Sequence, residues 1–317
     1  MAVDLTISIV NYGTWGLTHQ CLLSIGRYRR GLSLEVVVVD NTPPPMSGTV
    51  PDLIEPIDYP LHIVRNHANR GFGFAHNQAF AFANGEFFLV LNNDVRFLDN
   101  TRIDEILNWM RDHSSVGIVG IAQESDQLEN THVVAFDRFP GLKEIFNIYW
   151  LNRYQTMIGA KDQTRARKVA HINGAFMCFR RDLFHTLNGF LSEYFLYFED
   201  TDICFRSHKR CWQTWFLPRY SIWHEAGASA RNEKVDNRFF CSNYDHYHRS
   251  LLTFMALYYP RWQVFLTWVG LWVNFWCKFI WHKGFRNSTE RGMFYYRLFL
   301  TLKIWRGWRA VRPRRVI

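Results

Sequence analysis

The stretch that decides the fold is an apolar run with an abrupt polar end, Leu34-Glu-Val-Val-Val-Val-Asp40-Asn41. A continuous β-branched run of this length is typical of a strand that is buried on both faces of a parallel sheet. A similar run precedes it, Leu5-Thr-Ile-Ser-Ile-Val10, and it also ends on polar residues. Residues 14–28, between the two runs, have helical spacing. The order of strand, helix and strand predicts an α/β sheet.

The same alternation continues along the first half of the chain. Further strands are expected at residues 61–65, 86–91 and 116–121, and further helices at 72–84 and 101–113, the last of which Thr101 could cap. In the second half, a helix is expected at 142–157 and two short strands at 213–217 and 220–224. Strand and helix signals at this spacing predict a doubly wound sheet. The chain has 317 residues, of which 48% are hydrophobic, so a large α/β domain with its own core is expected.

Polar residues follow each of the first four predicted strands. They are Asn11-Tyr12, Asp40-Asn41, Arg65-Asn66 and Asn92-Asn93-Asp94. In doubly wound sheets, ligands bind beyond the carboxyl ends of the strands. A tyrosine there can stack on a nucleobase, and a terminal aspartate suits a divalent cation that carries a diphosphate. The alternative is that strand ends are polar because loops are polar.

One glycine-containing stretch invites comparison with a dinucleotide-binding loop, Asn69-Arg-Gly-Phe-Gly-Phe-Ala-His76. The third glycine of that motif would fall on His76, and the stretch follows the third predicted strand instead of the first. The dinucleotide reading is therefore excluded. Arg70, on a turn before a helix N-terminus, still predicts an anion site.

A cluster of acids lies behind an aromatic run, in Tyr197-Phe-Glu-Asp-Thr-Asp-Ile-Cys-Phe-Arg206. Charges next to side chains that bury well must face a cleft, a metal or a cation if they are to stay ionised. A carboxylate with carboxylate neighbours is also how a general base acquires a useful pKa. The alternative is that Asp200 and Asp202 cap a helix and pair with Arg206, while Glu199 is solvated.

Taken together, seven motifs resemble the family 2 glycosyltransferases, and among them the bacterial rhamnosyltransferase-like branch. They are the opening strand with Asn11-Tyr12, V-V-V-D-N ending at 41, N-R-G-F-G at 69–73, L-N-N-D at 91–94, N-G-A-F at 173–176, F-E-D-T-D at 198–202 and W-H at 223–224. The resemblance covers roughly residues 5–230 in the right order. It implies a GT-A fold (the nucleotide-diphospho-sugar transferase fold) and an inverting reaction.

The resemblance also implies roles for individual residues. The donor-binding residues are Asn11, Tyr12, Asp40, Arg70, Asn92 and Asp94. The catalytic base is Asp200, and the ligands of a divalent metal (Mg or Mn) are Asp94 and His224. The acceptor cleft includes Glu199, Asp202, Asn173 and Gly174. One base and one cation are also what inverting sugar transfer needs chemically. The family's D-x-D motif is here Asn92-Asn93-Asp94, which replaces a carboxylate with a weaker amide ligand. The alternative for His224 is an ordinary core histidine bonded to a backbone carbonyl.

The C-terminal part differs in character from the first 235 residues, so we expect a catalytic domain at 1–235 and a helical membrane-interface region at 236–317. Residues 262–281 are apolar but are interrupted by Gln263, Asn274 and Lys278, and they carry five tryptophans. In residues 300–311 apolar side chains share one helical face and basic ones the other. Such helices lie in the interface of an anionic leaflet. The alternative is a packing helix with a solvated basic face.

The distribution of charge and cysteine adds to the expected setting. Most of the net charge of +9 lies in the tail, where aromatic residues do not interleave with the basic ones, so nucleic acid is not an expected partner. Six scattered cysteines and an N-terminus without the features of a signal peptide predict a reducing, cytoplasmic setting, at the inner membrane surface.

These expectations combine into one function. It is the transfer of a sugar, rhamnose from dTDP-rhamnose, onto a lipid-linked glycan of a bacterial surface polysaccharide. The alternatives are transfer of galactofuranose or a hexose from a UDP-sugar, and a non-catalytic membrane adaptor that kept the fold.

Overall fold

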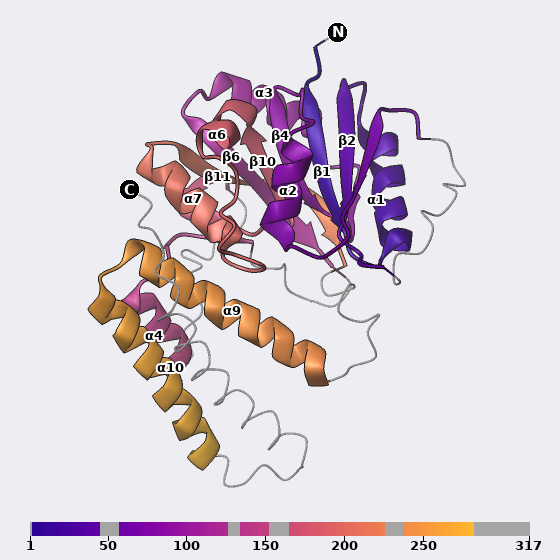
Figure 1. The fold of residues 1–317 in the computed structure, drawn as a ribbon. Helices are drawn as coiled ribbons and strands as arrows, with labels where there is room; N and C mark the ends of the chain where they lie inside the picture. The colour runs from indigo at the N-terminus through magenta and orange to yellow at the C-terminus, as the bar shows by residue number, and fades with distance from the viewer. Residues whose placement is uncertain (1, 45–56, 126–133, 152–164, 226–236, 282–317) are drawn as a thin grey trace.

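The computed structural model describes residues 2–44, 57–125, 134–151, 165–225 and 237–281 (Figure 1). The first half contains β1 (Leu5–Asn11), α1 (Trp15–Tyr28), β2 (Leu34–Asp40), β3 (Leu61–Arg65), α2 (Phe72–Phe80), β4 (Phe87–Asn92), β5 (Val95–Phe97), α3 (Ile103–Asp112), β6 (Val116–Glu124) and β7 (Ala135–Phe136). The second half contains α4 (Leu142–Leu151), β8 (Arg167–Val169), β9 (His171–Ile172), β10 (Phe176–Arg180), α6 (Arg181–Thr186), α7 (Glu199–Lys209), β11 (Gln213–His224), α9 (Asn237–Tyr258) and α10 (Arg261–Trp281).

Nine of the described strands form a central sheet in the order β3-β2-β1-β4-β10-β6-β11-β5, with β8 paired to β11, and β7 pairs with β9 in a separate two-stranded sheet. The first four strands are parallel, as the alternation of strand and helix predicts. Beyond β4 the sheet is mixed, because β10 runs antiparallel to both β4 and β6. The carboxyl ends of β1, β2 and β4 therefore meet at one edge, as the sequence analysis expected of a doubly wound sheet.

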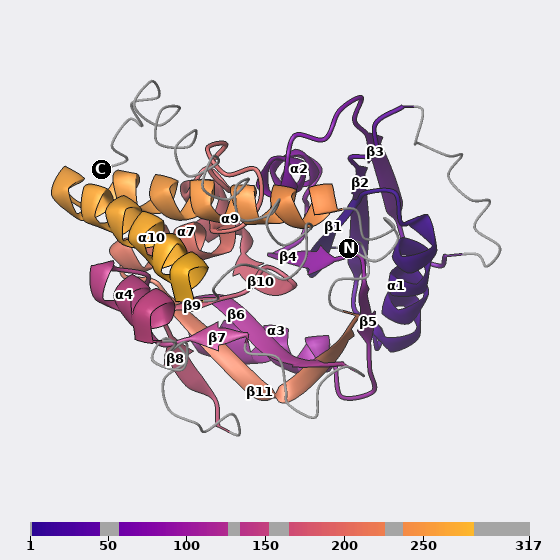
Figure 2. The same cartoon turned by 90° about the horizontal axis from the view of Figure 1, so that it is seen from below.

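Alternate residues of the buried strands face two different helical layers. Ile7, Val36 and Leu89 pack with α1 and α3 in one core cluster, whereas Val37 and Phe88 pack with α2, α6 and α7 in another. This two-sided burial explains why the strands read as continuous apolar runs and not as alternating ones. Figures 1 and 2 show the helices on both faces of the sheet.

The three helices α4, α9 and α10 share a third core cluster beside the sheet, and this cluster reaches α7 through Phe198. Figure 1 shows them together at one end of the molecule. The Tyr258 hydroxyl of α9 donates to the Asp202 carboxylate of α7, and the Ser250 hydroxyl donates to the Leu196 carbonyl. The described part of the C-terminal region is therefore packed onto the segment that carries the acidic cluster. Among the described helices, none has the length and apolarity needed to cross a bilayer.

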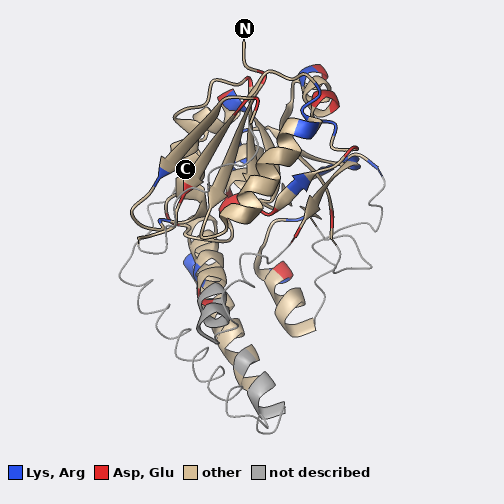
Figure 3. Cartoon of the chain, turned by 90° about the vertical axis from the view of Figure 1, so that its right-hand side faces the viewer, with Lys and Arg blue, Asp and Glu red and all other residues tan. Residues whose placement is uncertain are grey.

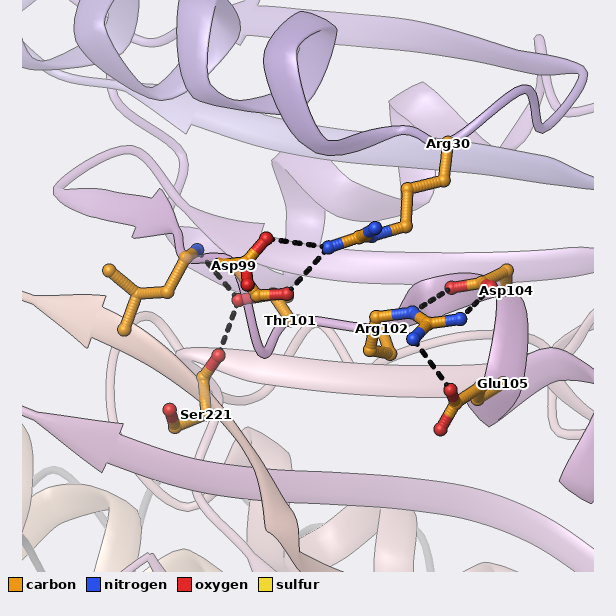
Figure 4. A network of polar contacts seen from close by, with 8 residues as sticks. Arg30, Asp99, Thr101, Arg102, Asp104, Glu105 and Ser221 are labelled. Atoms are coloured by element: carbon orange, nitrogen blue, oxygen red, sulfur yellow. Dashed lines mark hydrogen bonds and ion pairs between the residues drawn. The ribbon is translucent and has the colours of Figure 1, made fainter.

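Three local predictions need correction. Residues 213–217 and 220–224 were expected as two short strands, but they form the single strand β11, whose register shifts between Leu217 and Ser221. Thr101 does not cap α3. Its hydroxyl instead donates to the Ser221 carbonyl, and so ties the start of α3 to β11 (Figure 4). The helix expected at 142–157 ends at Leu151, and residues 152–157 lie outside the described part of the chain.

Candidate active site

The end of β4 sends its three polar side chains to two different places. The Asn93 amide donates to the hydroxyls of Thr14 and Thr18, at 2.7 and 3.0 Å, and so fastens β4 to the start of α1. Asp94 and Asn92 instead approach His224, which ends β11: Asp94 Oδ1 lies 3.2 Å from His224 Nε2, and Asn92 Nδ2 lies 3.4 Å from it. The two residues that the resemblance assigned to the metal are therefore neighbours.

A line of amides fixes the tautomer of His224. The Ala175 N–H donates to Asn173 Oδ1 at 3.4 Å, which orients the Asn173 amide. The Gln123 amide then donates to that oxygen at 2.6 Å, so that Gln123 Oε1 lies 2.9 Å from His224 Nδ1. His224 therefore donates its Nδ1–H to Gln123, and its Nε2 lone pair faces Asp94.

This arrangement suits a cation. A lone pair on His224 Nε2 and a carboxylate oxygen of Asp94, 3.2 Å apart, repel each other unless a proton or a cation lies between them. The described residues contain no group of three or more His, Cys, Asp or Glu side chains that could hold a metal. Two protein ligands are nevertheless what Mg²⁺ commonly has when substrate phosphates and water complete its coordination. The residues present therefore fit a divalent cation that arrives with a diphosphate.

Asp200 lies in the first turn of α7, where its carboxylate is held by donors. Its Oδ2 accepts the Gly174 N–H at 3.1 Å, and its Oδ1 accepts the N–H of Thr201 at 2.6 Å and the Thr201 hydroxyl at 3.2 Å. Burial raises the pKa of Asp200 above its ordinary value, and the bonds from Thr201 and Gly174 oppose that rise. Asp200 is therefore a half-buried carboxylate with a raised pKa, as a general base requires.

The backbone before α7 is unusual for its residue types. Tyr197 and Phe198 both have left-handed φ values, +69° and +67°. Non-glycine residues rarely adopt this conformation, which costs free energy and tends to occur at functional sites. The two residues turn the chain sharply, so that Glu199 and Asp200 begin the helix beside Gly174. The sequence does not predict these left-handed conformations, because neither residue is glycine or asparagine.

Glu199 is an unusual neighbour for a base. It is 5% exposed, and its Oε2 has no hydrogen-bond partner among the described residues. Burial, and then the nearby charge of Asp200, raise its pKa well above the ordinary value. The raised pKa favours the protonated, neutral form of Glu199, so that Glu199 does not repel the negative charge of Asp200.

The assignment of Asp202 to the acceptor cleft is wrong. Asp202 has no exposed surface; it accepts from Arg206 Nε at 2.7 Å and from the hydroxyls of Tyr194 and Tyr258. Burial raises its pKa, and these donors oppose the rise. Asp202 joins α7 to α9, so the pairing with Arg206 that the alternative reading offered is correct for this acid.

The donor-side residues at β1 and β2 bind one another. The Asn11 amide donates to Asp40 Oδ1 at 2.9 Å, and the Trp15 indole donates to Asp40 Oδ2 at 3.2 Å. Asn11 has no exposed surface and Asp40 is 2% exposed, so both hold the sheet edge in shape. Tyr12, which follows them, is exposed at 36% and is free to stack on a ligand.

Arg70 lies at the start of α2, with its guanidinium 3.7 Å from the centre of the Phe74 ring. The next residue, Gly71, has φ +97°, and a Cβ there would lie 2.4 Å from the Phe195 carbonyl oxygen. The Phe72 N–H donates to that same oxygen at 2.9 Å. Only glycine allows this approach, which sets Arg70 beside the segment that leads to Asp200.

The candidate residues are joined by one polar path. It runs from Asp94 through His224, Gln123 and Asn173 to Gly174, whose N–H reaches Asp200. Sequence reasoning missed Gln123, which is 1% exposed and lies near the end of β6. The signal was present: Gln123 is a polar residue at a strand end, like Asn92, but we expected that strand to stop at Ile121.

Comparisons with known proteins bear on this geometry. The model of the family described as "Glycosyl transferase family 2" matches residues 6–187. The chain is 25% identical to rhamnosyltransferase WbbL of Escherichia coli (strain K12) over 197 residues, which are 58% of this chain and 70% of that protein.

Two solved structures resemble the chain at low sequence identity. The mannosyltransferase PcManGT from Pyrobaculum calidifontis, in complex with GDP-Man and Mn²⁺, matches with a TM-score of 0.51 and 15% identity, over 99% of this chain and 77% of that one. GalNAc-T7, with UDP, GalNAc and Mn²⁺, matches with a TM-score of 0.56 and 12% identity, over 71% of this chain and 43% of that one.

Proposed function

The chain belongs to glycosyl transferase family 2, and from that premise we propose that it transfers rhamnose from dTDP-rhamnose to a lipid-linked glycan with inversion at the sugar. The expectations of a glycosyltransferase and of a GT-A fold are confirmed. The proposal of rhamnose is supported by the similarity to a rhamnosyltransferase. The two structural neighbours were solved with GDP-Man and with UDP and GalNAc, so a donor panel tests the nucleotide directly.

In the proposed reaction, the acceptor hydroxyl attacks the anomeric carbon on the side opposite the nucleotide. The new bond joins the acceptor oxygen to that carbon, the bond from the carbon to the diphosphate oxygen breaks, and Asp200 takes the hydroxyl proton. The raised pKa of Asp200 makes it a stronger base than an exposed aspartate. The Gly174 and Thr201 donors hold its carboxylate in one orientation while it waits for the proton.

The departing nucleotide needs its negative charge balanced. Asp94 and His224 would hold a divalent cation, which neutralises the diphosphate charge when it is bound. Gln123 Oε1 accepts the Nδ1–H of His224, which leaves Nε2 as the nitrogen that can bind the cation. Arg70, on the glycine turn before α2, would add a positive charge on the donor side.

One observation carries the proposal: a continuous polar path joins the Asp94–His224 pair to Asp200 within a single edge of the sheet. The experiment is a measurement of nucleotide release from a panel of dTDP- and UDP-sugars, with a lipid-linked acceptor fraction and with Mg²⁺ or Mn²⁺. Release from dTDP-rhamnose above all other donors supports the proposal. Preferred release from UDP-galactofuranose or a UDP-hexose would replace the donor and leave the reaction class intact.

The proposed setting is the cytoplasmic surface of an inner membrane, where a soluble donor meets a lipid-linked acceptor. Support comes from α4 and α10, which run side by side in the same direction: the Tyr259 hydroxyl reaches Pro140 near their starts, and the Asn274 amide reaches the Tyr149 carbonyl farther along. Their exposed large apolar side chains are Phe146, Trp150, Leu151, Trp262, Phe265 and Leu266, each 38–58% exposed, and the charged Lys143 and Arg261 are exposed near the helix starts. Figure 3 shows few charged residues on the described helices below the sheet.

Such an apolar surface, which we call the α4–α10 face, suits an interfacial position because tryptophan and phenylalanine favour the boundary between headgroups and acyl chains. The sequence beyond residue 277 supplies eleven Lys or Arg against one acid, so it is attracted to anionic lipid. We place the membrane contact on the α4–α10 face together with this basic tail.

A further inference from the structure

A groove lies between α1 and the edge strand β5, apart from the residues assigned to transfer. It has a volume of about 750 Å³, and its lining includes Gln20, Arg27, Tyr28, Arg96 and Trp223. Among the described residues that line it there is no Asp or Glu. Arg96 and Trp223 are direct partners in the pairing of β5 with β11. The next residue of β11 is His224, whose side chain leaves the opposite face of the strand, so the groove is separate from the candidate metal ligand.

The two arginines of the groove differ from the other arginines on this side of the molecule. Arg29 pairs with Asp58, Arg30 with Asp99, Arg102 with Asp104 and Arg111 with Glu86, at 2.6–2.7 Å. Figure 4 shows two of these pairs, Arg30 with Asp99 and Arg102 with Asp104. Arg27 and Arg96 are exposed and form no ion pair with an acid in the part of the chain that the structure describes. Within the described residues, the two positive charges on this groove thus have no counter-ion.

Aromatic rings hold both guanidinium groups in place. The Arg96 guanidinium carbon lies 5.4 Å from the centre of the Trp223 ring, and that of Arg27 lies 5.4 Å from the centre of the Tyr28 ring. This stacking orders the arginines without neutralising them. The Trp223 Nε1 is buried and has no hydrogen-bond partner among the described residues. A buried donor without an acceptor costs free energy.

We propose that this groove, the α1–β5 groove, binds an anionic saccharide. Guanidinium groups recognise carboxylate or phosphate, the apolar parts of Tyr28, Trp223 and Leu23 cover the C–H surface of sugar rings, and the Gln20 amide bonds hydroxyls. Nucleic acid fits less well, because only two cations line the groove.

The site is separate from the donor site, so its test needs neither donor nor metal. Binding of trigalacturonic acid, trehalose 6-phosphate and neutral maltotriose to the full chain is measured by titration calorimetry, supported by Trp fluorescence. The test variant is Arg27→Gln/Arg96→Gln. The matched control is Arg30→Gln/Arg102→Gln, which removes the same charge from arginines that are already paired.

We expect at least one anionic saccharide to bind at least tenfold more tightly than maltotriose, and the test variant to lose at least tenfold in affinity while the control changes less than twofold. The carboxylate and phosphate arms show which anion the groove prefers. If both variants lost affinity equally, the binding would depend on general surface charge, and the proposed site would be refuted. Absence of binding by both anionic saccharides at 5 mM would also overturn it, and neither result bears on sugar transfer by Asp200.

Discussion

The Nε2 nitrogen of His224 lies 3.2 Å from the Oδ1 oxygen of Asp94, and the other ring nitrogen is held by Gln123. This relationship places the histidine beside the aspartate at one edge of the sheet. In the proposed reaction, the chain has Asn92-Asn93-Asp94 in place of two carboxylates, and His224 would be the second ligand of the cation.

Replacing Asp200 with Asn removes the base and keeps the size of the side chain. We expect kcat to fall by about 10²- to 10⁴-fold, the usual contribution of general base catalysis, with little change in the Kd of the nucleotide sugar. Initial rates and equilibrium binding of the donor check this. Weaker donor binding at undiminished kcat would assign Asp200 to the donor and not to the acceptor.

The pH profile depends on the donors to Asp200. Burial raises the pKa of Asp200, so kcat/KM should fall as the pH drops through a value above the ordinary aspartate pKa. In Thr201→Val the hydroxyl bond to Oδ1 is lost, so the pKa rises further and the acid limb moves to higher pH, with the plateau kcat retained. An acid limb at the same pH in both proteins would show that the bond does not stabilise the carboxylate.

Gln123→Leu removes the acceptor that fixes the His224 tautomer. We expect Mn²⁺ affinity to weaken by about 10- to 100-fold, as is typical when the partner of a metal-bound histidine is removed. His224→Ala should weaken it at least as much. Mn²⁺ binding in the presence of nucleoside diphosphate, measured by electron paramagnetic resonance, needs no turnover. Gln213→Leu, on the same strand as His224 but away from it, is the control. Unchanged Mn²⁺ binding in both test variants would return His224 to a structural role.

Glu199→Gln should change how stability depends on pH. The pKa of Glu199 is higher in the folded than in the unfolded protein, so the folded protein keeps this proton to a higher pH. The free energy of unfolding therefore falls as the pH rises above the ordinary glutamate pKa of about 4.3. The glutamine variant lacks this loss. Its free energy of unfolding should therefore fall less between pH 5 and pH 8 than that of the unmodified chain. Urea unfolding at pH 5 and pH 8 measures this, and parallel pH dependence in the two proteins would contradict it.

Tyr258→Phe tests the joint between α7 and α9. The variant leaves the buried Asp202 with one donor fewer, and we expect a loss of about 1–3 kcal/mol in the free energy of unfolding. The KM for the donor should stay constant, because Asp202 has no exposed surface. Tyr259→Phe, whose hydroxyl bonds a backbone carbonyl, is a control for the loss of a tyrosine hydroxyl nearby. A higher donor KM with unchanged stability would place Asp202 in the cleft after all.

Trp262→Gln/Phe265→Gln/Leu266→Gln tests the α4–α10 face. We expect the variant to co-sediment at least fivefold less with liposomes of anionic lipid than the unmodified chain. The control is Ile63→Gln/Phe82→Gln, which removes exposed apolar side chains from elsewhere on the surface. Equal binding by the variant, or an equal loss in the control, would refute the face. Deletion of residues 260–317 should abolish sedimentation altogether.

The sequence predicted the parallel half of the sheet well, because strands buried on both faces leave long apolar runs that end on polar residues. It predicted the mixed half poorly. The strands β5 and β8 have three residues each, too few to show a period of two, and Pro218 made the single strand β11 look like two strands. Asp200 and His224 were found through the motifs of a family. Gln123 and the burial of Asp202 depend on contacts between distant segments, which no local pattern encodes.

The contact of Gly71 with the Phe195 carbonyl links the two halves of the site more tightly than any side chain does. Because no side chain fits between the turn that carries Arg70 and the segment that leads to Asp200, neither can move alone. Attempts to change sugar selectivity by loop exchange at 69–73 will therefore have to exchange 195–198 at the same time, and the two segments should be treated as one cassette.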